Sequence, residues 1–527
     1  MNNWYILHKN KVICSQVKSS DLPYVQAQIL LSEISKKMPS NHPLKGKAYY
    51  AGGSVRDEFL GQVPKDLDIV VEYPDGGISF AKYLSNLLNL REPVIFPTYG
   101  TAKLELKQLT FDGVDYDVDG VELEFVQTRK EQYHEDSRKP ETSHGTLMED
   151  VERRGFTVNS LLKKIESGPT MSVEDAENKV LKGEILDLTG RGVEDIQNGI
   201  IRTPLDPDII FSEDPLRVMR AIRFSVKYGW QMTDEVKEGI MKNLHRLPAV
   251  SMERIRDELD KIAKYGKMHK AIPLMQEMGL LQKIMPEMYA LMGINQDKVH
   301  HSEGDAYVHT LAVIEALEKN NPNANISLVW AAIAHDWGKY LTQKIKEDRI
   351  HFYGHEDVSA ALVEKRMREL KYPNDIIKKT VSLVQNHMRG HQSDQWTPKA
   401  YRNFYRDMGE NFDDILALLQ ADEEGSRPET GVKSQKHKTI REKMPSMSVE
   451  KIPQKPVLNG NQIIELLKKY NPQFKAGPII KDIMNLQMEI ITENPSILTG
   501  NQLVDAENMI KILEQDQRFI QIISNSK

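Results

Sequence analysis

Two aspartates, Asp66 and Asp68, stand two residues apart in the run DLDIVV, whose β-branched composition favours a strand. Side chains alternate between the faces of a strand, so we expect both carboxylates on one face, side by side. Neighbouring carboxylates repel unless a cation lies between them. Mg²⁺ takes carboxylate oxygens and usually completes its shell with substrate phosphates. The pair therefore predicts a magnesium site, and the alternative is an acidic pair that only faces solvent.

Two glycines precede this strand, between an earlier apolar strand and the start of a helix. Gly52 and Gly53 carry no Cβ, so their backbone N–H groups can approach an anion closely. The helix expected to begin at Ser54 adds a positive dipole end, and Arg56 adds a charge. Together with the predicted magnesium site, this segment indicates a triphosphate substrate and phosphoryl or nucleotidyl transfer.

A third carboxylate is expected on the next strands. Residues 121–126 alternate with period two, and they carry Glu124, which we expect to face the aspartate pair. The competing carboxylates are Asp115, Asp117 and Glu122. Residues 129–149 have little apolar content and predict a charged surface loop.

Two adjacent arginines follow, Arg153 and Arg154, directly before an apolar helical pattern. Guanidinium groups grip phosphate oxygens with two parallel hydrogen bonds, so the pair suits a triphosphate beside an acidic centre. The alternative is a surface charge cluster.

The segment SEDPLRVMRAIRF at residues 212–224 predicts a helix capped by Ser212, with Pro215 in its first turn. We expect Asp214 and Arg217, three residues apart, to project from one face of it. An acceptor beside donors is complementary to the Watson–Crick edge of cytosine or adenine, so protein could replace a template strand. The alternative is an intrahelical salt bridge.

Histidines and aspartates accumulate where the chain becomes helical in pattern. Imidazole and carboxylate ligands from several helices suit manganese, iron, nickel or magnesium. One ion would be held by His309, His335, Asp336 and Asp422. A second ion, near His355 and His387, would lie within bridging range and activate water. The alternative for any single histidine is a buried, hydrogen-bonded side chain, and His300, His301 and His391 are expected to lie outside the site.

The composition limits what else the chain could be. Its 527 residues predict more than one domain, and the net charge of −6 means that any RNA contact must use a local basic surface. No apolar run reaches the roughly 18 residues that span a membrane, and the amino terminus lacks an apolar signal core. The single cysteine, Cys14, fits a reducing compartment, so we expect a cytoplasmic protein without a membrane partner.

Five blocks in order, GGSVRDEFLG with DLD, LEFVQTR, RRGFTVNS, EDPLRVMRAIRF and SMERIRDEL, resemble the class II tRNA nucleotidyltransferase and bacterial poly(A) polymerase family. The resemblance implies metals on Asp66 and Asp68, and base recognition by Asp214 and Arg217. It also implies nucleotide contacts by Arg153, Arg154 and Asn159, and by Arg220 and Arg223 of the same blocks. One residue departs from the pattern: the family usually has Asp, which helps read the ribose, where this chain has Gly155.

The histidine pattern resembles the HD phosphohydrolases, and an HD domain behind a class II head is a known architecture of the family. The resemblance implies phosphatase and 2′,3′-cyclic phosphodiesterase activity on RNA ends.

The expected fold is α+β, with a small mixed sheet and helices in a nucleotidyltransferase head, followed by a helical neck, an HD domain and a helical tail. The predicted domains are an N-terminal extension (1–45), the head (46–165), the neck (166–265), the HD domain (266–430), and a basic linker with the tail (431–527).

The expected activity is template-independent addition of CCA to tRNA from CTP and ATP, with Mg²⁺ in the head and Mn²⁺, Ni²⁺, Fe²⁺ or Mg²⁺ in the HD domain. Three alternatives stay open: a poly(A) polymerase acting on other RNA 3′ ends, an HD hydrolase whose head is inactive because of Gly155, and an RNA-binding scaffold. The sequence does not predict an oligomeric state.

Overall fold

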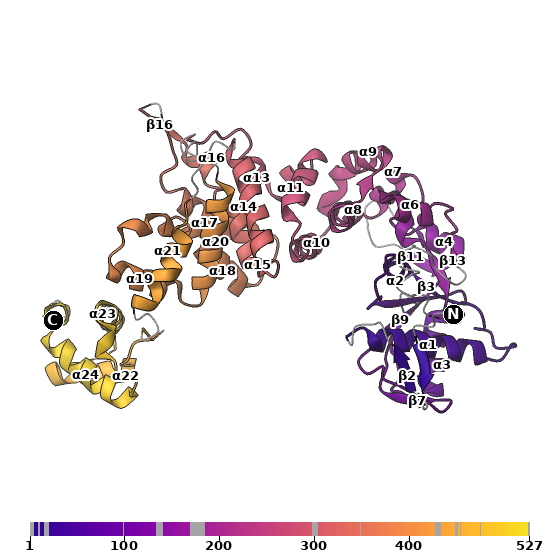
Figure 1. The fold of residues 1–527 in the computed structure, drawn as a ribbon, viewed down its shortest axis with the longest axis horizontal. Coiled ribbons are helices and arrows are strands. Elements are labelled where there is room, and N and C mark those ends of the chain that lie inside the picture. Colours follow the sequence, from indigo (N-terminus) through magenta and orange to yellow (C-terminus); the bar gives the residue numbers. More distant parts are fainter. Residues whose placement is uncertain are drawn as a thin grey trace. The chain divides into compact units, whose positions relative to one another are not determined.

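The computed structural model divides into two compact units, Met1–Leu259 with Glu277–Gly279, and Asp260–Gln276 with Leu280–Lys527 (Figure 1). The structure describes residues 5–8, 11–14, 20–97, 100–132, 141–168, 185–297, 304–347, 349–426, 434–447, 452–453, 455–474 and 476–524.

A mixed sheet forms the centre of the first unit, and within the described residues its strand order is β13-β12-β3-β4-β9-β6-β5. β4 and β9 run parallel, whereas the other neighbouring pairs are antiparallel. The strands are β3 (Ala48–Ala51), β4 (Leu67–Val71), β5 (Val94–Phe96), β6 (Thr101–Glu105), β9 (Glu122–Gln127), β12 (Leu162–Lys164) and β13 (Ile185–Leu186). The period-two segment 121–126 is therefore confirmed as a strand.

Helices cover this sheet, and a smaller sheet lies beside it. α3 (Gly76–Leu87) packs across β4, β6 and β9, with Phe80 stacked on Phe125 of β9. The N-terminal extension supplies α1 (Leu22–Lys37) and two strands of the second sheet, whose order is β1-β2-β8-β7. These strands are β1 (Tyr5–His8), β2 (Lys11–Cys14), β7 (Leu109–Phe111) and β8 (Val114–Tyr116).

The charged segment after β9 differs from the loop that the sequence predicts. It forms a two-stranded hairpin, β10 (Arg129–Gln132) with β11 (Glu141–His144), and then α4 (Leu147–Glu152). Thr146 and Glu149 form a capping box at the start of α4. Alternating charge on both faces of a short hairpin leaves no hydrophobic period, so the pattern alone indicated a loop.

Within the described residues of the predicted neck, β13 belongs to the head sheet, β14 (Ile200–Ile201) pairs with β15 (Gln231–Met232), and the rest is mainly helical. Its helices are α6 (Gly192–Asn198), α7 (Pro207–Glu213), α8 (Leu216–Tyr228), α9 (Asp234–Asn243) and α10 (Met252–Lys264). The helix predicted at residues 212–224 is confirmed as α8, but its predicted start at Ser212 is wrong, because Ser212 lies near the end of α7 and the chain turns at Asp214 and Pro215 before α8 begins. Pro215 lacks the N–H that would continue α7.

The second unit contains a bundle of helices from α14 onward (Figure 1). α14 packs against α15 and α20, and α17 and α18 pack together. The bounds are α14 (Ala306–Asn320), α15 (Ile326–Ala334), α17 (His355–Glu369), α18 (Asn374–Asn386) and α20 (Phe412–Gly425). A hairpin, β16 (Lys344–Lys346) with β17 (Arg349–His351), comes directly before α17.

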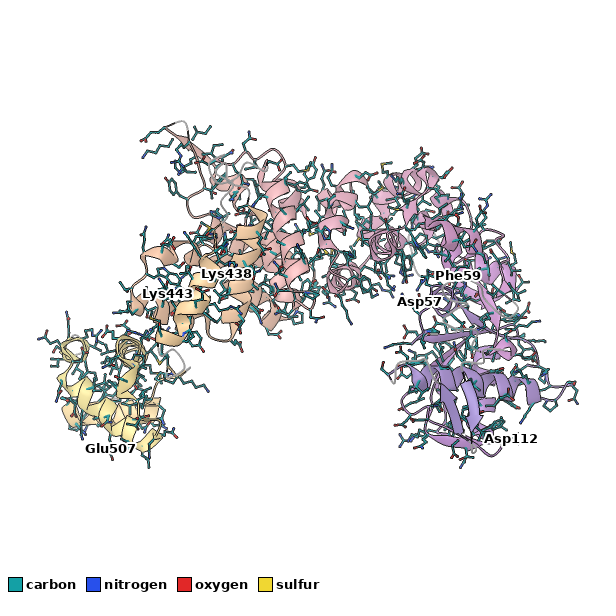
Figure 2. All side chains as sticks on the ribbon, viewed as in Figure 1. Asp57, Phe59, Asp112, Lys438, Lys443 and Glu507 are labelled. Carbon is teal, nitrogen blue, oxygen red and sulfur yellow. The ribbon has the colours of Figure 1, made fainter. Side chains whose placement is uncertain are left out.

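The basic segment after α20 is not only a linker. Residues Lys436–Lys443 form α21, on which Ile440 and His437 are buried while Lys438 and Lys443 lie on the surface (Figure 2). The tail follows as α22 (Gly460–Tyr470), α23 (Ile479–Glu493), α24 (Gln502–Gln515) and α25 (Gln517–Ser524), around a core that includes Ile483, Leu513 and Phe519.

The α+β class is thus confirmed: a mixed sheet with helices in the head, then a helical remainder. Among the described residues, every helix is too short or too polar to cross a membrane.

Candidate active sites

The first site is built on adjacent strands of the head sheet. Asp68 on β4 lies opposite Glu124 on the parallel strand β9, and Glu124 lies opposite Lys103 on β6. Opposite residues on neighbouring strands project to the same face, so the three side chains form one row across the sheet. Lys103 Nζ lies 3.0 Å from Glu124 Oε2. The competing carboxylate Asp115 belongs to β8 of the other sheet, where it accepts a hydrogen bond from Thr110.

Asp66 lies one residue before β4, in a bend, and is exposed. It nevertheless acts on Asp68 electrostatically. Loss of hydration raises the pKa of the Asp68 carboxyl, and the neighbouring carboxylates Glu124 and Asp66 raise that pKa further. Repelling carboxylates of this kind are stabilised by a divalent cation, so the donor set fits the predicted magnesium site.

The glycine turn lies against this row. Gly52 has φ +66°, and a Cβ there would approach within 2.9 Å of an Arg154 guanidinium nitrogen, so both the turn and the arginine need glycine. α2 (Gly53–Phe59) has seven residues, and the Ser54 hydroxyl on it accepts from the backbone N–H of Asp68 at 3.3 Å. The glycine turn and the acidic strand are therefore joined by a hydrogen bond.

Arg56 is buried beneath the site. Its guanidinium donates to the Asn159 side chain and to Asp57, and it lies 5.2 Å from the ring centroids of both Phe224 and Tyr228. Arg56 therefore positions the Asn159 side chain through this hydrogen bond. Arg56 itself does not line the cavity that is described next.

A cavity of about 770 Å³ collects most of the predicted head residues. From the predicted set it is lined by Gly52, Gly53, Asp68, Arg153, Arg154, Asn159, Asp214, Arg217 and Arg220. Asp66, Glu124, Arg56 and Arg223 lie outside this lining. Gly155, the position that the resemblance associates with the ribose, lines the cavity as well, whereas the sequence reasoning missed Arg129, Glu131, Thr142, Ala249, Ser251 and Arg254 as lining residues.

A buried carboxylate holds the two predicted phosphate-binding arginines. Asp150 accepts from Arg153 through Oδ1 at 2.6 Å and from Arg154 through Oδ2 at 2.9 Å. Burial opposes ionisation of Asp150, but Arg154 and Arg153 hold its pKa below the ordinary value. Arg153 is held from the other side by Glu131 of the β10–β11 hairpin at 3.2 Å. Neither carboxylate has a spacing signal in the sequence that would mark it as part of the site.

Asp214 and Arg217 both reach the cavity, although they do not share a helix. The Arg217 guanidinium donates to the carbonyls of Ile210 at 2.9 Å and Arg153 at 2.8 Å. Gly155 packs against Arg217, where a Cβ would lie 3.3 Å from Arg217 Cδ. The departure from the family pattern therefore lies beside the candidate base-reading arginine.

Arg220 and Arg223 on α8 have different surroundings. Arg223 Nε lies 2.5 Å from Glu258 on α10, and its guanidinium packs 4.4 Å from the Phe224 ring centroid. Arg220 Nε lies 3.9 Å from Glu258 and lines the cavity. Glu258 therefore joins α10 to α8. Arg220, and not Arg223, is the candidate for contact with the nucleotide, because only Arg220 of the two lines the cavity.

The second site centres on Asp336, which is almost fully buried. Its Oδ2 lies 3.1 Å from His335 Nε2 and 3.6 Å from His309 Nε2, whereas its Oδ1 lies 3.3 Å from His355 Nε2 and 3.9 Å from His387 Nε2. The two oxygens thus face two separate histidine pairs. Asp422 Oδ1 completes the first group, 3.0 Å from His309 Nε2.

Three of the imidazoles are oriented by the main chain. In each, Nδ1 faces the carbonyl of the residue three positions earlier, and because a carbonyl only accepts, Nδ1 carries the proton and Nε2 keeps a lone pair. The contacts are His335 with Ala332 (2.9 Å), His355 with Phe352 (2.7 Å) and His387 with Val384 (2.6 Å).

The Nε2 atoms of each histidine pair lie close to each other. His335 and His309 have Nε2 atoms 3.4 Å apart, and those of His355 and His387 are 3.3 Å apart. Burial lowers the pKa of His387 well below its ordinary value, and repulsion from the neighbouring imidazoles of His355 and His335 lowers that pKa further. The His387 imidazole is therefore neutral. Two groups that share Asp336, His309 with His335 and His355 with His387, are close enough to hold metal ions. Neutral imidazole with carboxylate is a donor set that such ions accept.

His391 corrects the sequence-based expectation that it lies outside the site. The His–Asp cluster opens onto a cavity of about 580 Å³, which His391 also lines. His391 Nε2 lies 2.8 Å from Asp422 Oδ2. Lys339 also lines the cavity, with Nζ 2.6 Å from Asp336 Oδ2. His300 and His301 lie outside the described residues.

Comparisons with known proteins agree with this organisation. The family models described as the poly(A) polymerase head domain, a probable RNA-binding site of polymerase A and the HD domain match residues 48–202, 229–292 and 306–425. A CC-adding tRNA nucleotidyltransferase of Thermus thermophilus is 25% identical over 450 residues, which cover 84% of this chain and 90% of that protein. A multifunctional CCA protein of Actinobacillus pleuropneumoniae is 28% identical over 400 residues, covering 72% and 85%.

Solved structures share the fold. A Bacillus stearothermophilus CCA-adding enzyme in complex with CTP superposes with a TM-score of 0.60 at 19% identity, covering 95% of this chain and all of that one (100%). A Thermotoga maritima CCA-adding enzyme complexed with tRNA gives 0.53 at 17% identity, covering 94% and 97%. The chain therefore contains a poly(A) polymerase head domain at residues 48–202 and an HD domain at residues 306–425, and over most of its length it is similar to tRNA nucleotidyltransferases.

Proposed function

We propose that the head adds CMP and AMP, taken from CTP and ATP, to the 3′ end of tRNA without a nucleic-acid template, producing CCA. The observation that carries the proposal is the cavity in which Asp68, the Arg153–Arg154 pair and the Asp214–Arg217 pair meet. It brings a carboxylate for a divalent ion, cations for a triphosphate and an acceptor–donor pair for a base into one space. The kinship with CC-adding and CCA-adding proteins supports it.

In the proposed reaction the 3′-hydroxyl oxygen of the RNA bonds to the α-phosphorus of the nucleotide. The bond from that phosphorus to the bridging oxygen breaks, pyrophosphate leaves, and the hydroxyl proton passes to solvent. Asp66, Asp68 and Glu124 would hold Mg²⁺, which supplies a lowered hydroxyl pKa and charge neutralisation. Arg153 and Arg154, held in place by Asp150, grip the phosphates, and Asn159, which Arg56 positions, contacts the sugar.

Base selection is assigned to Asp214 and Arg217. Cytosine and adenine each donate from an exocyclic amine and accept at the adjacent ring nitrogen. Asp214 is the acceptor for the amine, and Arg217 is the donor for the ring nitrogen. The contacts of Arg217 with the carbonyls of Ile210 and Arg153 fix its direction but leave other guanidinium hydrogens for a base.

The test is incubation of tRNA that lacks its terminal nucleotides with labelled CTP and ATP, followed by measurement of the added length. Addition of CCA, and no more, is expected. Addition of C residues alone would assign this chain one part of the reaction, as the name of the CC-adding Thermus relative describes for that protein, and addition of a single A would assign it the other part. A long tail from ATP alone would identify a poly(A) polymerase, and no incorporation would overturn the proposal.

We propose in addition that the HD domain is a metal-dependent phosphohydrolase acting on RNA 3′ ends, because five further potential ligands lie on two sides of Asp336. Water adds to phosphorus, and the bond to the departing ribose oxygen breaks as that oxygen takes a proton. Two ions, Mn²⁺, Ni²⁺, Fe²⁺ or Mg²⁺, would supply a more acidic water and neutralise the phosphate. His309, His335, Asp336 and Asp422 hold one ion, and His355 and His387 the other.

Ring opening of a nucleoside 2′,3′-cyclic phosphate to the monophosphate, phosphate release from a nucleoside 3′-monophosphate, and metal content by elemental analysis test this second activity. His335→Ala should remove metal and phosphate release while CCA addition persists. Asp66→Ala should abolish CCA addition while phosphate release and the metal content of the HD domain persist. If His335→Ala keeps both its metal and its phosphate release, the HD assignment is wrong.

A further inference from the structure

The mouth of the HD cavity carries an aromatic surface that the proposed hydrolase chemistry does not use. Five consecutive residues, Arg349–Tyr353, from the end of the β16–β17 hairpin line this cavity together with the His–Asp cluster. The rings of His351 and Tyr353 stack with centroids 5.1 Å apart and an interplanar angle of 10°. Tyr353 is 67% exposed although it lines a cavity. A large exposed ring, held flat by its neighbour, is a stacking surface for another planar group.

The main chain fixes the distance between this surface and the cluster. Phe352, between the two stacked residues, accepts through its carbonyl from the Nδ1–H of His355, whose Nε2 faces Asp336. Lys339, whose Nζ contacts Asp336, lies 5.3 Å from the Phe352 ring centroid. The peptide group of Phe352 thus connects the stacked rings of His351 and Tyr353 to the candidate metal ligand His355 through one hydrogen bond.

The remaining lining suits the other parts of a nucleotide. Ile350 and Met388 add apolar surface, and the cationic lining comes from Lys436 and from Arg349, whose guanidinium pairs with Asp297 at 2.5 Å. A cavity of about 580 Å³ is of the size that takes a small ligand of several rings and polar groups. A plain phosphomonoester would use the cluster and leave the rings uncovered.

We propose that the HD cavity binds a nucleoside phosphate in one orientation, with its phosphate at the His–Asp cluster and its base stacked on Tyr353. The inference rests on the proposed hydrolase and names its substrate class: a phosphate attached to a nucleoside, either free or at an RNA 3′ end. Stacking on an aromatic side chain tolerates every base, because each has a π-face. The surface therefore selects nucleotides over other phosphate esters without selecting a sequence.

Fluorescence of 2-aminopurine tests the stacking directly, because this base is quenched when it stacks. The probes are 2-aminopurine riboside 3′-phosphate and a short RNA that ends in the same nucleotide, each titrated with the manganese-loaded full-length protein. Quenching is expected with wild type. Tyr353→Ala should weaken binding by roughly 5- to 150-fold, the range for loss of one base–aromatic stack. Tyr353→Phe should keep the quenching, because it keeps the ring.

Tyr289→Ala is the matched control, since Tyr289 is also an exposed tyrosine of the same unit but does not line the cavity. Tighter binding of the RNA probe would identify an RNA end as the source of the nucleotide, and equal binding would identify the free nucleotide. Unchanged affinity of Tyr353→Ala, or no quenching by wild type, would overturn the proposal. Quenching that depends on Tyr353 without any phosphate release would support the stacking surface and contradict the hydrolase separately.

Discussion

Asp68 and Glu124 occupy the same register position on the parallel strands β4 and β9, so their carboxylates stand beside each other on one face of the head sheet. Their mutual repulsion contributes to the raised pKa of Asp68. A pair that repels in the free protein is stabilised when a divalent cation enters. The strand register therefore places the two carboxylates of the proposed ion site side by side in the free protein.

Asp66→Ala should abolish nucleotide incorporation while leaving the fold intact, because Asp66 is exposed in a bend outside the sheet core. Incorporation of labelled CTP into shortened tRNA and the thermal unfolding temperature measure the two effects. Asp115→Ala, the same change on the second sheet of the head, should leave incorporation unaltered. Persistent incorporation by Asp66→Ala would refute the metal assignment.

Gly155→Asp should raise the preference for CTP over dCTP, because the family resemblance implies that a carboxylate here reads the ribose. The added Cβ comes 3.3 Å from Arg217 Cδ, which a small shift of that side chain accommodates. The measurement is the ratio of kcat/KM for the two nucleotides. Gly155→Ala introduces the same Cβ without the carboxylate, so an equal ratio in both variants would reject a ribose-reading role.

Asp150→Asn should destabilise the head by on the order of 3 kcal/mol at pH 7, because two arginines lose their buried counter-charge. The folded pKa of Asp150 lies below that of the unfolded chain, about 3.9, so its contribution is present above that pH and is lost as pH falls through the folded value. Urea unfolding of wild type and variant should therefore differ at pH 7 and converge in stronger acid. A difference that does not depend on pH would show that the carboxylate charge is not responsible.

Lys163→Met should cost about 3–5 kcal/mol of unfolding free energy, because it removes the buried ammonium group that lies 2.8 Å from the buried carboxylate of Glu58. The double variant Lys163→Met with Glu58→Gln should recover much of that loss. Lys237→Met, which removes an exposed pair with Glu277, should change stability by at most about 1 kcal/mol. Urea unfolding compares the three, and a double variant no better than the single would contradict the account.

Local chemistry made part of this site predictable. The DLD spacing, the glycine turn and the RR pair each carry a physical signature within a few residues, and Asp68, Gly52 and Arg154 do meet at one cavity. The strand at 121–126 was predictable because one of its faces is buried.

Long-range packing made the rest unpredictable. Asp150 and Glu131 look like ordinary surface acids in the sequence, and only the tertiary fold aims them at Arg153. His391 lies outside the motif spacing, but the 3₁₀ turn at residues 389–395 carries it to Asp422. Asp214 and Arg217 fit one helix by spacing, yet Asp214 lies in the turn that follows α7, whereas Arg217 belongs to α8.

The carbonyls of Ala332, Phe352 and Val384 supply the hydrogen-bond acceptors that set the imidazoles of the HD cavity. Every amino acid has such a carbonyl, so replacing these three side chains leaves the acceptors in place. Alanine scanning would overlook them, and the residues at those positions are free to vary in evolution as long as the helices keep their ends. The orientation of these three imidazoles thus depends on the path of the backbone and not on the identity of the side chains that precede them.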